Sequence, residues 1–476
     1  MHIKKFLTIA LSMLTAAVAV SHAGTPIPLD SCRSMALRNN KTMQIAQERI
    51  NAAEYQKKQA FAAYLPGIDF AGGYMYNQKE ISLLSGDQML PTKTFNPSTG
   101  TYDFNLLTGP DGRPVQVNGQ YVPTQVALIP KEAMTFDIHN LFAGAVTLTQ
   151  PIYMGGKIRA LNKMAEMGQE IASLMHDNTA REVVYSVDAA YWQIVSLGEK
   201  KKLAVSYIEL LDTLHSNVEA MIRQGIATNS DLLNVEVKLN EANIDLTKVD
   251  NGLALSRMAL AQICGMPMTQ EFTLADEVSD HKSFGAMQPA AYTMQDVYNN
   301  RSDIKSLELA VKVYEQKQYE ARSSMLPTVA LVGTYGFSNP NIFNGFDKKF
   351  NGMFSVGAMV KIPLWHWGGN YYKYKAARSE SIVKSLELEE AKEKIELQVS
   401  QASYKTAEAA KTLRTTESNL SKADENLRQA QLGYKEGVMT LDNVMAAQTA
   451  WLKANSENIV QLCNVYLSKV TGTLKY

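Results

Sequence analysis

The side chains that could perform catalysis or hold a metal are scattered along this chain. Its seven histidines include no pair four residues apart, and none lies beside one of the three cysteines, Cys32, Cys264 and Cys463. Zinc sites and Cys–His nucleophiles depend on such spacings. The sequence also lacks the glycine-rich run followed by Lys-Ser/Thr that binds phosphate. Carboxylates fall in mixed-charge runs such as 387–396, which indicate a solvated helix face. We therefore predict that the chain is not an enzyme and holds neither a cofactor nor a metal.

The first residues and the charge balance indicate the compartment. Lys4 and Lys5, the apolar run 6–20 and the small residues before Ala23 are typical of a secretory signal, so we predict a signal peptide over 1–23 with cleavage after Ala23. Its removal leaves 45 basic against 47 acidic residues, a balance that argues against nucleic acid as a partner. No later run supplies the roughly 20 apolar residues of a membrane-spanning helix, so entry into a membrane would have to use strands.

Four short segments alternate apolar residues with small or polar ones, which is the period of a strand with one apolar face. We predict strands at 67–77, 141–150, 328–338 and 354–363. Asp69, Met359 and Lys361 fall on the polar faces. A lysine on a lipid-facing surface near the bilayer centre costs about 2–4 kcal/mol, so these three residues are predicted to face a barrel lumen.

The remaining pattern is helical and unusually long. Helices are predicted over 29–64 and 292–326, and helical hairpins over 156–264 and 369–474. A helix of about 65 residues would be roughly 100 Å long, which a compact domain does not need. From Leu232 to Ile263, apolar residues recur at alternating spacings of three and four, as they do in a coiled coil. Asn39 and Asn40 predict a break in the first helix.

This succession of elements occurs twice. Pro66 recurs 261 residues later as Pro327, and Gly225 recurs 212 residues later as Gly437. We therefore divide the mature chain into a first repeat, 24–285, and a second repeat, 286–476. The offset between matching positions changes from 261 to 212 residues between the two strands of each repeat. The segment between the strands is therefore 49 residues longer in the first repeat than in the second. That segment, 78–140, is rich in turn formers and is predicted to be a long irregular loop outside the cell.

Four strands cannot close a barrel, because small barrels need about eight and open edges are not tolerated in hydrocarbon. Several chains must therefore pool their strands, and three would supply 12. Bends are predicted at the strand–helix junctions Pro151, Gly155, Gly156, Pro363, Gly368 and Gly369. Beside the second junction lies an expected aromatic girdle at the membrane surface, made by Trp365, Trp367, Tyr371 and Tyr372. The alternative is that these rings fill a soluble core.

Together these features resemble the TolC family of outer-membrane efflux proteins. The resemblance is carried by the strand-end turns QPIYMGGK and IPLWHWGGN and the hairpin turns RQGIATNSDLLNVE and KEGVMTLDNVMAAQTA, in this order and spacing. It implies an α+β membrane protein that is a homotrimer. Four β-strands per chain would form a 12-stranded β-barrel in outer-membrane lipid, and the long antiparallel helices would form a periplasmic α-helical tunnel. It also implies two partners, a periplasmic adaptor protein and an inner-membrane transporter.

The resemblance assigns adaptor-facing and gating roles to the two hairpin turns, Gly225, Ile226, Ala227, Thr228, Gly437, Val438, Met439 and Thr440. Asp231 matches an acid that is common after the first turn, but it also completes a capping box with Thr228. Tyr434 is either a gating contact or a packing residue. Some members carry an acidic ring after the second turn. Here Asn443 and Ala446 occupy those positions and Asp442 lies one place early, so a charge-selective gate does not carry over.

The predicted function is a passive exit duct for small molecules delivered by an inner-membrane pump and a periplasmic adaptor. It would lie in the cell outer membrane and extend into the periplasm. Two alternatives stay open from sequence. One is a duct for polypeptides served by an ATP-driven exporter. The other is a soluble periplasmic coiled-coil scaffold.

Overall fold

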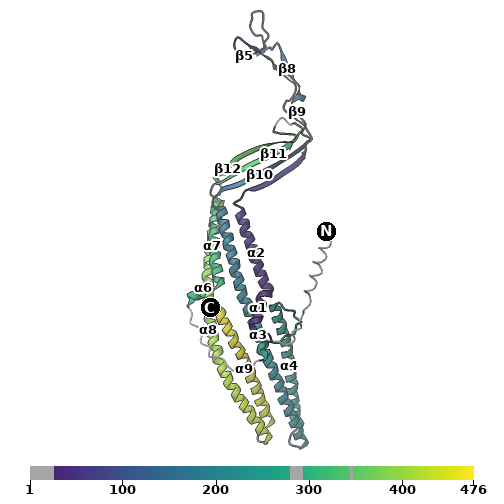
Figure 1. Ribbon diagram of the computed structural model, residues 1–476, viewed down its shortest axis with the longest axis vertical. Coiled ribbons are helices and arrows are strands. Elements are labelled where there is room, and N and C mark those ends of the chain that lie inside the picture. The colour runs from purple at the N-terminus through teal and green to yellow at the C-terminus, as the bar shows by residue number, and fades with distance from the viewer. Residues whose placement is uncertain (1–25, 279–292, 344–346, 476) are drawn as a thin grey trace, which may run out of the picture. The chain divides into compact units, whose positions relative to one another are not determined.

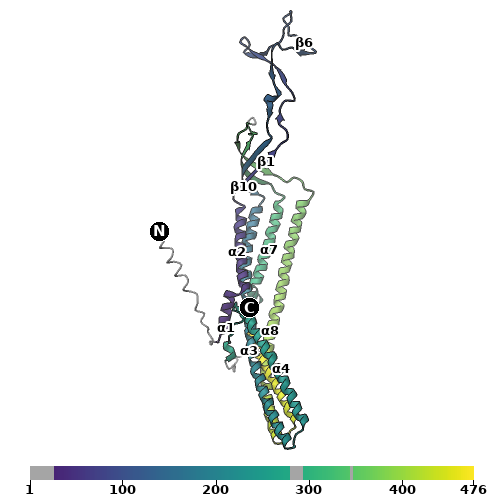
Figure 2. The ribbon, with the colours of Figure 1, turned by 90° about the vertical axis from the view of Figure 1, so that its right-hand side faces the viewer.

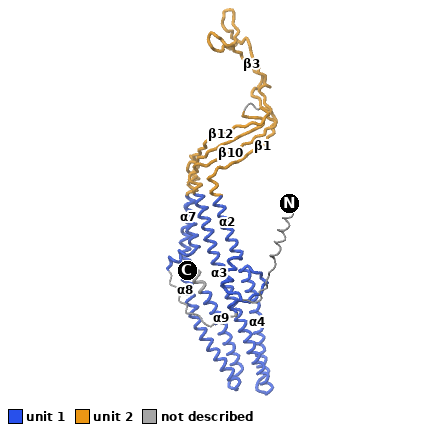
Figure 3. The backbone as a smooth tube through the Cα atoms, viewed as in Figure 1, with its two compact units in different colours: residues 1–58, 160–318, 374–476 blue, residues 59–159, 319–373 orange. Residues whose placement is uncertain are grey.

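The computed structural model describes residues 26–278, 293–343 and 347–475. The predicted signal peptide, its cleavage after Ala23 and the boundary between the repeats lie outside this part of the chain. The chain divides into two units (Figure 3), a helical unit of residues 1–58, 160–318 and 374–476, and a β unit of residues 59–159 and 319–373. Both halves of the sequence contribute to each unit.

The β unit contains one four-stranded sheet in the order β1-β10-β11-β12 (Figure 1). Its strands are β1 (Gly67–Tyr76), β10 (Asn140–Met154), β11 (Thr328–Asn339) and β12 (Asn351–Lys361). Each neighbouring pair is antiparallel and is paired over nearly its whole length. The order leaves β1 and β12 as the two edges of the sheet.

Pro151 does not end the second strand, which the sequence predicted to stop at Gln150. β10 continues to Met154, and Pro151 lies opposite Ala330 of β11. The register instead shifts between Pro151 and Tyr153. Proline cannot donate a ladder hydrogen bond, and a bulge at that point accommodates the missing bond without ending the strand.

Residues 78–140 are not irregular as predicted, because the incoming and outgoing chain pair with each other. The pairs are β2–β9 (Ile81–Ser82, Thr135–Phe136), β3–β8 (Gln88–Pro91, Val126–Ile129), β4–β5 (Lys93–Asn96, Thr101–Phe104) and β6–β7 (Gln116–Val117, Gln120–Tyr121), with the 3-10 helix η1 (Lys131–Met134) before β9. The turn formers do form turns, since residues 97–100 close the β4–β5 hairpin. Strands of two to four residues are too short to show a clear alternation.

The helices follow the same order in both halves. The first half has α1 (Leu29–Asn39), α2 (Lys41–Ala62), α3 (Lys157–Arg223) and α4 (Asn229–Cys264), and the second has α6 (Met294–Asn300), α7 (Ser302–Ser323), α8 (Gly369–Lys435) and α9 (Leu441–Lys475), with the short α5 (Ala275–Val278) between them. This order confirms the predicted tandem repeat. α3 and α4 run antiparallel, as do α8 and α9 (Figures 1 and 2). Among the helices described, none combines the length and the apolar character needed to cross a bilayer.

A buried ion pair holds α1 against α3. Nε and Nη2 of Arg33 donate to Oδ1 and Oδ2 of Asp188, each at 2.7 Å. The Asp188 side chain is wholly buried. A buried carboxylate is tolerated here because both of its oxygens accept charge-assisted hydrogen bonds. The surrounding apolar core draws on α1, α3 and α4.

We expect Gly265→Ala to destabilise the helical unit more than Gly225→Ala. Both glycines end a helix with positive φ, +70° and +74°. A Cβ on Gly265 would lie 2.6 Å from Asn39 Cβ and 3.0 Å from its carbonyl oxygen, whereas a Cβ on Gly225 would meet nothing within 4 Å. The left-handed backbone costs each alanine about 1–2 kcal/mol, and the collision adds about 1–3 kcal/mol at residue 265. Thermal unfolding followed by circular dichroism should separate the two variants, and equal losses would contradict this close contact.

Candidate functional site

The first hairpin turn is closed by backbone hydrogen bonds. The N–H groups of Gly225 and Ile226 donate to the carbonyls of Ile222 and Met221, each at 2.9 Å. Glycine suits the left-handed conformation that this closure requires. The reversal leaves the Ile226 side chain 70 % exposed at the tip.

Thr228 and Asp231 then cap α4 reciprocally. The Thr228 backbone N–H and hydroxyl donate to Asp231 Oδ2 at 2.8 and 2.7 Å, and the Asp231 N–H donates to Thr228 Oγ1 at 3.3 Å. These bonds, led by the backbone N–H of Thr228, lower the pKa of Asp231 because they favour its charged form. The structure thus gives Asp231 the capping role that the Thr-x-x-Asp spacing predicts.

The second turn has the same outline but a different closure. Gly437 has a φ of +75°, and the N–H groups of Val438 and Met439 both donate to the Gly433 carbonyl, at 2.8 and 3.1 Å. The Met439 side chain folds over Gly433, where an added Cβ would lie 2.9 Å from Met439 Cγ. Val438 is 79 % exposed. Met439 is 40 % exposed, so the second tip presents two exposed apolar side chains and the first presents Ile226.

The two turns rest on one apolar cluster. It includes Val218 and Val235 of the first hairpin and Val444 of the second, with Ala227 and Tyr434 packed against it. Burial raises the pKa of Tyr434, with a smaller contribution from the Asp231 carboxylate. The contact with the cluster supports a packing role for Tyr434, and the gating role stays a prediction. Thr440 directly precedes α9, and Asp442 is exposed in the first turn of that helix.

Glycines make both strand–helix junctions. Gly155 and Gly156 have φ values of +63° and +85° after β10. A Cβ on Gly155 would lie 2.8 Å from the carbonyl oxygen of Ser323, so the backbones approach closely there. At the second junction Gly368 has a φ of +78° and its neighbour Trp367 a φ of +49°, while Gly369 is the first residue of α8.

The aromatic residues beyond Pro363 do not fill a core in this chain. Trp365 and Trp367 are 73 % and 86 % exposed, and their rings meet edge to face with centroids 6.0 Å apart. Tyr371 and Tyr372 are also exposed and form a similar pair at 5.6 Å. The soluble-core alternative is therefore wrong for these rings. Exposed tryptophan and tyrosine beside a strand end suit a membrane–water interface, and the girdle stays a prediction.

The sheet has one apolar face and one face of small and polar side chains. Directly paired residues of antiparallel strands point to the same face. One such row, exposed in this chain, is Phe70, Val146, Tyr335 and Phe354. The adjacent row on the opposite face is Asp69, Thr147, Thr334 and Ser355.

Asp69, Met359 and Lys361 share the polar face. Asp69 belongs to the row that ends at Ser355, and Met359 and Lys361 lie an even number of residues along β12 from Ser355. Because side chains alternate along a strand, all three point the same way. That this face lines a lumen stays a prediction about the assembled protein.

One group of potential metal ligands occurs in the described part of the chain. Glu80, Asp137 and His139 each offer an atom within 4.8 Å of the others. Lys348 Nζ lies 2.6 Å from Asp137 Oδ2, and this ammonium holds the pKa of Asp137 well below its usual range. His139 Nδ1 lies 2.6 Å from the other carboxylate oxygen. Since a fixed cation already occupies this carboxylate, we assign no metal to the group.

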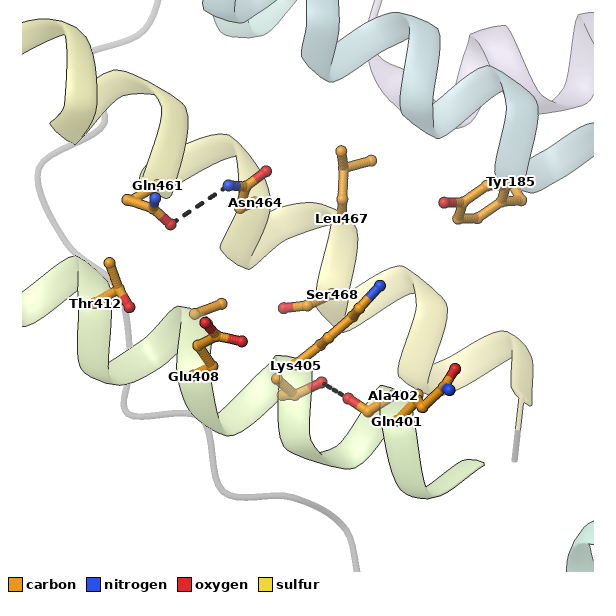
Figure 4. Close-up of a pocket in the computed structure, with 12 residues that line it drawn as sticks. Tyr185, Gln401, Ala402, Lys405, Glu408, Thr412, Gln461, Asn464, Leu467 and Ser468 are labelled. Carbon is orange, nitrogen blue, oxygen red and sulfur yellow. Dashed lines mark hydrogen bonds between the residues drawn. The ribbon is translucent and has the colours of Figure 1, made fainter. Parts of the chain in front are cut away.

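A polar groove of about 520 Å³ lies between α8 and α9, with Tyr185 of α3 nearby (Figure 4). Lys405 and Glu408 of α8 line it, and on α9 the Asn464 amide donates to the Gln461 side chain at 3.4 Å. These groups offer no serine, cysteine or threonine activated by a histidine, as nucleophilic catalysis would need. The two turns and the two faces of the sheet stay the candidate functional surfaces.

Sequence reasoning missed two long-range contacts. Arg33 pairs with Asp188 across 155 residues, and Cys264 contacts Cys32 across 232. Asp188 carried a usable signal, because an acid in the otherwise apolar run 187–192 needs a partner when that face is buried. The cysteines carried none.

The chain is similar in sequence and in structure to known outer-membrane proteins. Residues 131–266 and 293–466 match the model of the outer membrane efflux protein family. The chain is 21 % identical over 320 residues to protein CyaE of Bordetella pertussis and 20 % identical over 338 residues to outer membrane protein TolC of Escherichia coli. These matches cover 66 % and 67 % of this chain and 66 % of each relative, just under two thirds of the relatives' length. The crystal structure of outer membrane protein VceC from Vibrio cholerae is similar, with a TM-score of 0.69 and 14 % identity, over 93 % of this chain and 94 % of VceC.

We expect Asp231→Ala to loosen the start of α4, while Asp442→Ala changes the start of α9 much less. Loss of the reciprocal cap should cost about 0.5–1 kcal/mol, whereas Asp442 lies one position too early for such a bond. Because folding lowers the pKa of Asp231, the cap contributes fully above the unfolded-state pKa of about 4 and is lost as the pH falls through the lower folded value. Hydrogen exchange of the α4 N-terminal amides, corrected for intrinsic rates, measures both effects. Equal changes in the two variants would contradict the assignment.

Proposed function

The chain belongs to the outer membrane efflux protein family, and we propose that it is the outer-membrane channel of a tripartite efflux system, a passive exit duct for small molecules. It is an outer-membrane protein that extends into the periplasm. The family assignment contradicts the alternative of a soluble periplasmic scaffold. The observation that carries the proposal is the sheet, which has two unpaired edges and two chemically different faces.

The unpaired edges require other copies of the chain. Within the described residues, β1 pairs only with β10 in this sheet, and β12 only with β11. Their outer N–H and C=O groups have no water to bond in the hydrocarbon of a bilayer, and each unpaired group there costs several kcal/mol. An even number of antiparallel strands leaves β1 and β12 antiparallel to each other, so β12 of one copy can pair with β1 of the next. Such head-to-tail pairing closes into a ring.

The need for a passage sets the smallest ring at three copies. Two copies would give eight strands, and a barrel of that size is filled by its own side chains or holds one small ligand. Three copies of the four-stranded sheet would give 12 strands and a wider interior. The polar face, which is rich in glycine, alanine, serine and threonine residues, would then line a wet lumen, and the apolar face would meet lipid.

The hairpin turns supply the surface for a partner. Ile226 and Val438 are exposed apolar side chains held on closed turns that share one apolar cluster. A rigid apolar tip can enter a partner's pocket with little loss of conformational entropy. We assign these tips to a periplasmic adaptor protein that would connect the duct to an inner-membrane transporter. The long helices of three copies would enclose the periplasmic passage.

Purified protein tests the duct directly. We expect a trimer in detergent, by size-exclusion chromatography with light scattering, and discrete ion-conducting channels when that trimer is added to a planar lipid bilayer. The polar face explains the conductance, since it would keep the lumen hydrated. A monomer that inserts no channels would overturn the proposal.

A matched pair of substitutions in the centre of β12 tests which face meets lipid. Val356 lies on the apolar face and is 68 % exposed, while its neighbour Ser355 lies on the polar face. We expect Val356→Arg to cost about 2–4 kcal/mol per chain in the membrane and to reduce assembled trimer strongly. Ser355→Arg should assemble normally and alter only conductance and ion selectivity. Equal assembly of the two variants, scored by heat-modifiable trimer in outer-membrane fractions, would reverse the assignment of faces.

A further inference from the structure

Two of the three cysteines meet in the core of the helical unit. Cys32 lies on α1 and Cys264 is the last residue of α4, and both are wholly buried. Cys264 Sγ lies 3.5 Å from the Cys32 carbonyl oxygen. The two sulfurs are also within hydrogen-bonding reach, and this contact together with burial raises the pKa of Cys32. The third cysteine, Cys463, is buried on α9 and belongs to neither of these helices.

The backbones around the two cysteines approach closely. The Asn40 side-chain amide donates to the Ile263 carbonyl at 2.8 Å. One residue after Cys264, the absent side chain of Gly265 lets the backbone pass against Asn39. Disulfides require Cα atoms within about 4.4–6.8 Å, a distance reached only where two segments pack this tightly. In the structure the two thiols are free and lie against each other where α1 meets the end of α4, which is the kind of close approach that a covalent link requires.

We propose that Cys32 and Cys264 form a disulfide bond in the exported protein. Every outer-membrane protein passes through the periplasm, where disulfides form and persist. Two thiols in mutual contact are oxidised there unless burial protects them first. The bond would join the first helix of the first repeat to the last residue of its hairpin, closing a loop across 232 positions.

The oxidant is a disulfide donor of the periplasm, and the exchange balances in two steps. A thiolate from one cysteine attacks a sulfur of the donor disulfide, forms a mixed disulfide and expels the other donor sulfur as a thiolate. The second cysteine then attacks the protein sulfur of the mixed disulfide, forms the Cys32–Cys264 bond and releases the first donor sulfur. The two protein sulfurs lose two electrons and two protons, and the donor leaves as a dithiol. Because both thiols are buried in the fold, the first step occurs while the chain is still folding, and the second step closes the bond as α1 packs against α4.

Thiol counting on the full chain tests the bond. Outer membranes from cells that make the protein are treated with N-ethylmaleimide at lysis, to stop exchange. The protein is then denatured in fresh N-ethylmaleimide, so that free thiols buried in the fold, including that of Cys463, are blocked as well. After the excess reagent is removed, the protein is reduced and labelled with maleimide-polyethylene glycol. We expect two labels per chain, those of Cys32 and Cys264. A control sample that is denatured and blocked but never reduced should carry none. A wild-type chain that accepts no label after complete blocking and subsequent reduction would overturn the proposal, as would a bond to a second chain in peptide mass spectra.

Variants assign the labels. Cys463→Ala should keep both labels, because that cysteine is blocked before reduction in either case. Cys32→Ala should lose both, since Cys264 then has no partner and is blocked. If Cys32→Ala fails to accumulate, a peptide carrying the Cys32–Cys264 link in unreduced wild-type protein decides the question alone. Two labels in Cys32→Ala would show that another pairing is responsible and would sink the assignment.

Discussion

The unpaired backbone groups along β1 and β12 are the constraint on which the rest of this structure depends. A four-stranded antiparallel sheet has two such edges, and hydrocarbon offers them no hydrogen-bonding partner. Because β1 and β12 run antiparallel to each other, copies of the same chain can satisfy both edges without any new element. In the proposed ring, the strict alternation of side chains would give the wall an apolar outside and a polar inside. Lipid contact and a wet passage would then both follow from one pattern of residues.

The helical hairpins solve a different problem, which is how to hold short turns in a defined shape at the end of helices of 67 residues. Each turn uses a left-handed glycine to reverse the chain, and the first adds a reciprocal Thr–Asp cap. The apolar cluster that includes Val235 and Val444 binds the two turns to one another. A tip built in this way keeps its exposed apolar side chain in place, which would suit recognition by the proposed adaptor.

Two sequence predictions were wrong, and both errors concern strand pairing. Pro151 was expected to stop β10, but the pairing with β11 continues past it with a shift of register. Segment 78–140 was expected to be irregular, yet its incoming and outgoing chain pair at β2–β9 and β3–β8. In each case the decisive interaction is with a strand that lies elsewhere in the sequence. Local propensity describes the conformation that a residue prefers by itself. It does not include the hydrogen bonds and packing that a partner strand adds.

The sequence by itself determined the kind and order of the elements, because alternation, helical period, glycine and proline act over a few residues. The tandem repeat, the two faces of the sheet and the Thr228–Asp231 cap were all readable in this way. Only the tertiary structure decided which distant groups meet. Arg33 with Asp188, Lys348 with Asp137, and Cys32 with Cys264 lie 155, 211 and 232 positions apart. Such contacts depend on how helices and loops pack in three dimensions, and nothing in the spacing of the residues themselves encodes that arrangement.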